Sequence, residues 1–168
     1  MKRRGMQEGV YVVEFAIISA LLFTLLFGVL EIGRLYYTVN VLNESVRRGA
    51  RLAAVCNISD PVVLRRAIFN SAGNSGASTL LADLDTGDLT LRYLDKNGAL
   101  VANPGDLVSA TGFAAVRYVQ LTLQNFQFSL FIPGFGVPIT LPVFKATLPR
   151  ESLGRHTEAD VAPEITPC

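Results

Sequence analysis

Residues 10–30 read VYVVEFAIISALLFTLLFGVL, an apolar run in which Glu14 is the only charged residue. As an α-helix, a run of this length extends about 30 Å, which is close to the thickness of the hydrocarbon core of a bilayer. A helix of a soluble protein would show a polar face over the same number of turns, and this run shows none. The sequence therefore predicts a transmembrane helix rather than a buried core helix.

A short basic segment, residues 1–9, precedes this helix and carries Lys2, Arg3 and Arg4. Positive residues beside a transmembrane helix tend to stay on the cytoplasmic side, and no matching cluster follows Leu30. No small-residue site for ordinary signal peptidase follows the apolar run, so we expect the helix to stay with the protein. These features predict a single-pass protein with a cytoplasmic leader and the rest of the chain on the far side.

The transmembrane helix should continue through residues 31–55 as an amphipathic helix, because apolar residues recur there at steps of three and four. No proline interrupts it before Pro61. Residues 56–80 should hold a short helix from Pro61 to about Asn70, followed by a connector rich in glycine and serine. The chain is thus expected to be mostly helical from residue 10 to about Asn70, where the connector follows.

Alternation with a period of two predicts a small strand-rich domain over residues 81–150. Strands are expected at 89–93 and 119–123. The first should form a hairpin with Leu100 and Val101 through the turn at 95–98 (DKNG). A third strand is expected over residues 139–143, restricted by its prolines to a sheet edge or a broken pairing. The predicted class is therefore α+β, a long N-terminal transmembrane plus amphipathic helix followed by a small antiparallel β-sheet domain.

Two further segments complete the chain. The stretch FQFSLFIPGF, residues 126–135, is an aromatic cluster that either packs in the core or forms an exposed patch for a partner. Residues 151–168 hold few large apolar side chains and predict an extended tail.

The composition excludes several functional classes. The net charge is +1, and no block of lysine or arginine lies outside the N-terminus, so a nucleic-acid binder is not expected. Cys56 and Cys168 lack the close spacing of a metal site, so we expect no metal and no cofactor. Two interpretations of the cysteines stay open: a disulfide, if the domain lies outside the cytoplasm, or two separate free thiols.

The longer string GVYVVEFAIISALLFTLLFGVLEIGRLYY (residues 9–37), followed by LNESVRRGARLAAV (residues 42–55), resembles prepilin-type substrates and looks like the TadE family of tight-adherence pilus proteins. The similarity runs from about Gly5 to Val55 and is specific, because VEF, FGVLEIGR and RRGAR occur in that order. Past Val55 the resemblance is general and implies a small pilin-like domain of similar length.

The resemblance implies a minor pseudopilin that assembles or anchors a Flp-type pilus used in cell adhesion, a system related to type IV pilus-like secretion. It implies processing by an aspartic prepilin peptidase, and a bacterial inner-membrane location with the C-terminal domain in the periplasm. The implied partners are the membrane, the prepilin peptidase, other pilin-like subunits and pilus assembly proteins. No small-molecule substrate is expected.

By that resemblance Gly9 and Val10 flank the cleaved bond, and Glu14 and Phe15 become the fifth and sixth residues of the mature chain. Glycine suits the site because it leaves the backbone unhindered. An unpaired carboxylate near the bilayer core costs roughly 2.5 to 3.5 kcal/mol, and the new ammonium at Val10 can neutralise Glu14 within one helix or between neighbouring helices. The alternatives are a solvated Glu14 near the interface and a Gly9 that is merely flexible.

Ala16 and Ala20 form a small-x-x-x-small step that, with Glu14, is expected to mediate helix–helix assembly. A different interpretation of the whole chain is an uncleaved signal-anchored periplasmic protein whose outer domain binds a ligand or partner. A membrane-tethered hydrolase is the least supported, because His156 lies in the tail and no nucleophile elbow or metal-ligand cluster is recognised. We therefore expect a protein that is not an enzyme.

Overall fold

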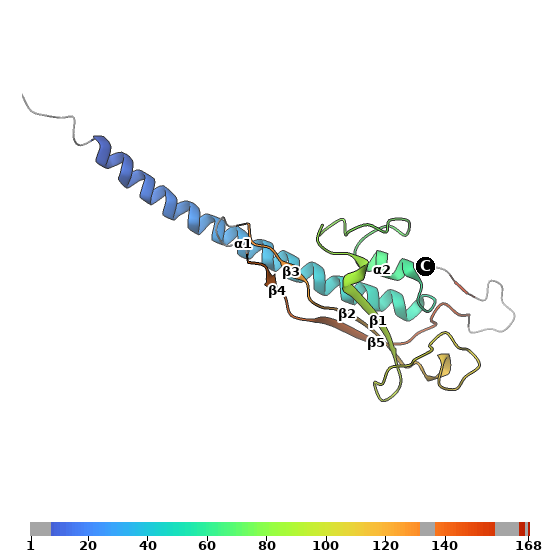
Figure 1. Ribbon diagram of the computed structural model, residues 1–168. Coiled ribbons are helices and arrows are strands. Elements are labelled where there is room, and N and C mark those ends of the chain that lie inside the picture. Colours follow the sequence, from blue (N-terminus) through green and yellow to red (C-terminus); the bar gives the residue numbers. More distant parts are fainter. Residues whose placement is uncertain (1–7, 132–136, 157–164, 167) are drawn as a thin grey trace, which may run out of the picture. The chain divides into compact units, whose positions relative to one another are not determined.

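The computed structural model describes residues 8–131, 137–156, 165, 166 and 168 (Figure 1). The basic residues of the leader and the end of the aromatic cluster at Phe135 lie outside the described residues. The described chain begins with one long helix, α1 (Glu8–Val55), and continues with short helices and antiparallel strands. The predicted α+β class, with a long apolar N-terminal helix followed by small antiparallel sheets, is confirmed.

The chain divides into two units that share α1. The first unit comprises Met1–Tyr37 and Phe128–Ile139, and the second comprises Thr38–Gln127 and Thr140–Cys168. The apolar part of α1 belongs to the first unit, and the amphipathic part belongs to the second.

The second unit is built on a three-stranded antiparallel sheet of order β1-β2-β5. Its strands are β1 (Leu89–Leu94), β2 (Tyr118–Leu123) and β5 (Phe144–Pro149), and β2 pairs with both neighbours. Every second residue of β2, namely Val119, Leu121 and Leu123, is fully buried, as the alternation in the sequence predicts. The central strand thus supplies one continuous face of the core.

The amphipathic part of α1 covers this core with a stripe of small and branched side chains. Its buried side chains are Thr38, Val41, Leu42, Ser45, Val46, Ala50, Ala53 and Ala54. Gly49 lies on the same stripe, and a Cβ placed there would clash with the side chain of Leu121 and stand 2.7 Å from the Cβ of Ala67. Glycine is required at this point because the helix backbone approaches β2 and the next helix too closely for a side chain.

The short helix α2 (Pro61–Ala67) begins where the sequence predicted and ends three residues earlier than expected. Asp60 caps it by accepting a hydrogen bond from the N–H of Val62 at 2.9 Å. After Ala67 the chain turns at Phe69, whose φ is 66°, and the N–H of Asn70 bonds to the carbonyl of Arg65. This is a Schellman ending in which phenylalanine takes the left-handed position that glycine usually occupies, so the sequence carried no signal for it.

Two strand predictions need correction. The hairpin at the DKNG turn is short, because Leu100 makes only an isolated bridge to Leu94 and the main partner of β1 is β2. The strand expected over residues 139–143 is shorter than predicted, β4 (Ile139–Thr140), and among the described residues it pairs only with β3 (Gln127–Phe128), so the expected edge position and broken pairing are confirmed. Pro142 has no N–H to donate to a ladder, and the long strand β5 begins only after it.

The remaining elements are two single-turn 3₁₀ helices, Thr86–Asp88 and Phe113–Ala115, in the connections of the second unit. The first precedes β1 directly and is capped by Asp85, whose carboxylate accepts from the N–H of Gly87 at 2.6 Å. Neither changes the class of the fold.

Candidate functional site

The predicted processing site lies in the first turn of α1. Gly9 follows the first helical residue, and a Cβ placed on it would meet no atom within 4 Å. Val10 is 55% exposed, so both sides of the Gly9–Val10 bond are open.

Glu14 lies one turn further along α1 on an exposed surface. Among the described residues it makes no hydrogen bond or ion pair, and its neighbour Phe15 is 73% exposed. Glu14 follows Val10 by four residues within α1 and has no partner from the described part of the same chain.

The side chains in the rest of the apolar part of α1 are also largely exposed. Its most apolar 18-residue window has a mean hydropathy of 2.4 and none of it is buried, so α1 is long and apolar enough to cross a membrane. Ala16 and Ala20 are both exposed and available to a neighbouring helix. The hydroxyl of Thr24 donates to the carbonyl of Ala20 at 2.8 Å, which satisfies this polar group inside an apolar segment.

A second cluster marks the end of the apolar run and was not predicted in this form. Glu31 is 8% exposed and accepts a hydrogen bond from Arg34 Nε at 3.0 Å and another from the backbone N–H of Phe131. Arg34 donates to the carbonyl of Ser129, and its guanidinium lies 4.5 Å from the ring centre of Phe128 and 3.6 Å from that of Phe131. We call these five residues, Glu31, Arg34, Phe128, Ser129 and Phe131, the exit clamp.

The sequence showed Glu31 and Arg34 only as polar residues that follow the apolar run. Their contact with residues 128–131 joins positions about a hundred apart in the chain. The signal that could have suggested it is the aromatic cluster of residues 126–135, whose phenylalanines suit the face of a guanidinium. Within that cluster Phe126 and Phe128 are 5% exposed and pack as core residues, whereas Phe131 is 76% exposed, so the interpretation as a docking patch stays a prediction.

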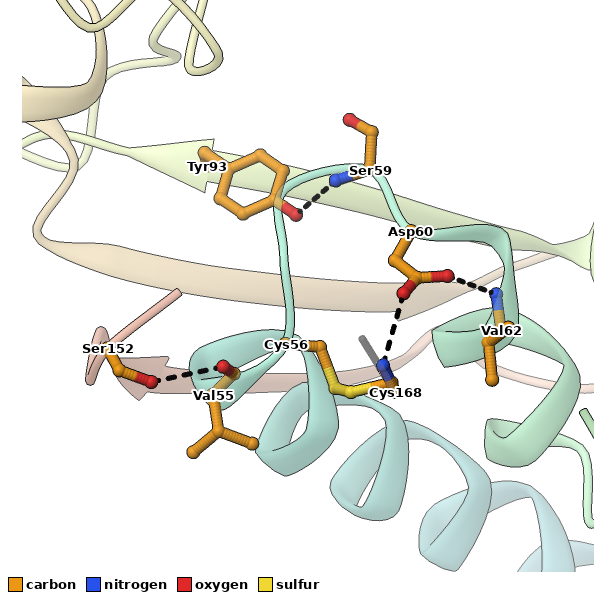
Figure 2. The surroundings of a disulfide bond; sticks show 8 residues. All are labelled: Val55, Cys56, Ser59, Asp60, Val62, Tyr93, Ser152 and Cys168. Carbon is orange, nitrogen blue, oxygen red and sulfur yellow. Dashed lines mark hydrogen bonds between the residues drawn. A yellow bond between two sulfur atoms is a disulfide. The ribbon is translucent and has the colours of Figure 1, made fainter. Parts of the chain in front are cut away.

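In the second unit a disulfide joins Cys56, directly after α1, to Cys168 (Figure 2). Cys56 is 1% exposed and packs in a cluster with Val63 and Tyr93. The Asp60 carboxylate contacts both α2 and Cys168. One of its oxygens caps α2, and the other accepts a hydrogen bond from the N–H of Cys168 at 3.5 Å.

Tyr93 lies beside this disulfide cluster, and its hydroxyl accepts a hydrogen bond from the N–H of Ser59 at 3.0 Å (Figure 2). Burial raises the pKa of Tyr93 above its usual value, and the nearby Asp60 carboxylate adds to the rise while the Ser59 hydrogen bond opposes it. The phenol is therefore held neutral and serves a structural role.

The second unit also contains a cavity of about 600 Å³. Its lining includes Asn57, Asn103, Asp106, Phe113 and Arg155, which are mixed polar and apolar groups without a convergent set of acids and bases. In the part of the chain that the structure describes, no group of three histidine, cysteine or acidic residues is placed to hold a metal ion.

The match that the comparisons with known proteins found lies within α1 and does not reach the strands. Searches of curated proteins and of solved structures gave no match. A scan against protein families gave one over residues 9–51, which covers the candidate processing site, the exit clamp's two helical residues and Gly49. The segment from Gly9 to Arg51 is thus a match to the TadE-like protein family, as its sequence resemblance indicated.

Proposed function

We propose that this chain is a minor pseudopilin-like subunit that a prepilin peptidase cleaves after Gly9 and that assembles or anchors a tight-adherence, Flp-type pilus. The TadE-like match ties residues 9–51 to Tad/Flp pilus systems, and the long apolar helix indicates membrane anchoring. The observation that carries the finer proposal is Glu14, an exposed acid on an exposed apolar helix. In this proposal the protein is not an enzyme and needs no cofactor.

An acid in this position needs a partner outside the described chain. Left unpaired near the bilayer core, it costs roughly 2.5 to 3.5 kcal/mol. Cleavage after Gly9 turns the neutral amide nitrogen of Val10 into an ammonium, which can pair with Glu14 of the same helix or of a neighbour. A pair between neighbours also fixes their axial register, because only one offset joins both charges.

The proposed location is the bacterial inner membrane, with the N-terminus in the cytoplasm and the second unit in the periplasm. The disulfide between Cys56 and Cys168 supports this orientation, because disulfides persist in oxidising compartments such as the periplasm. Partners in this proposal are the membrane, the peptidase and other pilin-like subunits.

The first test is the mature N-terminus, measured by mass spectrometry after expression with and without a prepilin peptidase. We expect a chain beginning at Val10 only when the peptidase is present. Gly9→Leu should block cleavage, because the bulky side chain fills the space beside the scissile bond. The matched control is Gly28→Leu, since Gly28 also has no atom within 4 Å of a built Cβ and lies in the same helix. A chain that retains its leader with an active peptidase would contradict the proposal.

The second test addresses Glu14 by site-specific crosslinking between subunits in the membrane. Glu14→Gln keeps the shape and removes the charge, and we expect at least a tenfold loss of crosslinks, since pairing offsets a cost of about 2.5 kcal/mol or more. The control is Glu44→Gln, an exposed acid on the same helix in the second unit. Equal crosslinking in both variants would argue against an assembly role for Glu14.

The cavity of about 600 Å³ favours one alternative, an uncleaved signal-anchored protein whose outer domain binds a ligand or partner. This alternative predicts a retained leader together with indifference to loss of the Glu14 charge. The two experiments above therefore separate the two functions.

A further inference from the structure

The first unit exposes apolar side chains next to the exit clamp. Phe131 and Val137 are each 76% exposed, and Ile139 is 43% exposed. The sequence around them, from Gln124 to Phe144, contains no charged residue and five of the ten phenylalanines of the chain. Large apolar groups in this number are rarely left in water unless they contact a partner or a membrane.

The exit clamp fixes this apolar segment to a known position along α1. Glu31 holds the backbone N–H of Phe131, while Arg34 holds the carbonyl of Ser129 and stacks on both aromatic rings. Glu31 is the first residue after the apolar run of residues 10–30. The segment is therefore attached where α1 leaves the hydrocarbon core.

Helix α1 also carries aromatic side chains just after the clamp residues Glu31 and Arg34. Tyr36 is 68% exposed and Tyr37 is 49% exposed, and both belong to the first unit. Tyrosine is enriched where transmembrane helices cross the membrane–water interface, because its ring is apolar and its hydroxyl is polar. The clamp adds a neutralised ion pair at this level, which suits a depth where an unpaired charge is costly.

We propose that Phe131, Val137, Ile139, Tyr36 and Tyr37 form an interfacial patch that contacts the same bilayer that α1 spans. The partner is the lipid surface, because these residues are apolar or aromatic and belong to the same unit as the apolar run of α1, with Tyr36 and Tyr37 following that run and Phe131 held beside Glu31 by the clamp. The patch carries no charge, so its binding is apolar and does not require anionic lipid. This inference rests on the membrane position of α1 but not on cleavage or on the pilus role.

The test uses the full chain in zwitterionic vesicles, with tryptophan as the probe, because the chain contains none. Phe131→Trp and Val137→Trp report the patch, and Val108→Trp is the control, since Val108 is 97% exposed and lies in the second unit. Lipids brominated near the headgroup or near the bilayer centre quench tryptophan that touches them. Leu22→Trp in the middle of the span gives the reference for the deep bromines.

With bromines near the headgroup, we expect the tryptophan of both patch variants to be quenched at least threefold more than that of Val108→Trp. In each patch variant these bromines should also quench more strongly than bromines near the bilayer centre. Quenching should be unchanged when salt is raised or when the lipid-to-protein ratio is raised tenfold. Two patch variants guard against one that disturbs the clamp, and an intact disulfide by mass shows that each variant has folded.

Quenching of both patch variants no greater than that of Val108→Trp would overturn the proposal. So would a blue-shifted emission without bromine quenching, or quenching lost on dilution in lipid, because either result means that protein covers the patch. The cleavage experiment is independent: a chain that keeps its leader but shows the expected quenching rejects the pilus role and leaves the membrane contact in place.

Discussion

Removing the disulfide between Cys56 and Cys168 should cost the second unit a large part of its stability. The bond closes a loop with a sequence separation of 112 residues, and the chain-entropy estimate for such a loop is about 5 kcal/mol. Measured losses for natural disulfides are about 2 to 5 kcal/mol, so Cys168→Ala should lose an amount in that range. Cys56→Ala should lose about 1 kcal/mol more, because Cys56 is 1% exposed and its truncation leaves a small cavity.

The assay is urea unfolding of the full chain in detergent micelles, followed by near-ultraviolet circular dichroism. A loss of about 4 kcal/mol lowers the urea midpoint by roughly 1 to 4 M for ordinary denaturant slopes. The double variant should match Cys56→Ala alone, because the loop can be opened only once. Losses that add in the double variant, or a Cys168→Ala chain within 1 kcal/mol of an oxidised wild type, would refute the loop-closure reasoning.

Three further predictions concern the second unit. Gly49→Ala should destabilise it by about 1 to 2 kcal/mol in the same urea assay, because the clash with Leu121 exceeds the gain in helix propensity of roughly 1 kcal/mol. Stability should fall as the pH rises from about 10 through the raised pKa of Tyr93, because the unfolded chain releases the phenol proton first; Tyr93→Phe should remove this slope in unfolding curves measured against pH. Asp60→Ala should cost about 1 kcal/mol by urea unfolding, since the cap on Val62 is lost.

These predictions are checked with control variants. Gly33→Ala should show no loss, because a Cβ there meets no atom within 4 Å. Asp83→Ala removes an acid of the same unit that lies outside the cap and should change stability by less than about 0.5 kcal/mol. A large loss in any control would show that the assay reports something other than the named contact.

The parts of the fold that follow from local periodicity were predictable. The three- and four-residue spacing after Leu30 indicated the continued helix, and the alternation in residues 119–123 indicated the central strand. Both signals are strong because one face of each element is buried, which forces apolar residues into a fixed period. The start of α2 was equally readable from Asp60 and Pro61, since capping depends on side chains within three residues.

The parts of the fold that depend on distant or unusual contacts were not predictable from the sequence. Phe69 ends α2 in the left-handed region without the glycine that would have announced it. Asn70, which is 4% exposed, donates to the carbonyls of Gly76 and Ala77 and so organises a connector that composition alone describes as flexible. The exit clamp joins residues about a hundred apart, and no local pattern encodes such a pairing.

Two acids of the first unit, Glu14 and Glu31, show why position along one helix gives the same residue type different roles. Glu31 lies just past the apolar run and finds a cation and a backbone N–H within its own unit, so its charge is satisfied before any assembly. Glu14 lies inside the run and finds no partner among the described residues. Among the described residues of the uncut chain, the four-residue step before Glu14 leads to Val10, whose backbone amide is neutral. On the proposed route, processing is therefore what creates the charge that Glu14 can pair with, and it couples the removal of the leader to the step at which neighbouring helices can assemble.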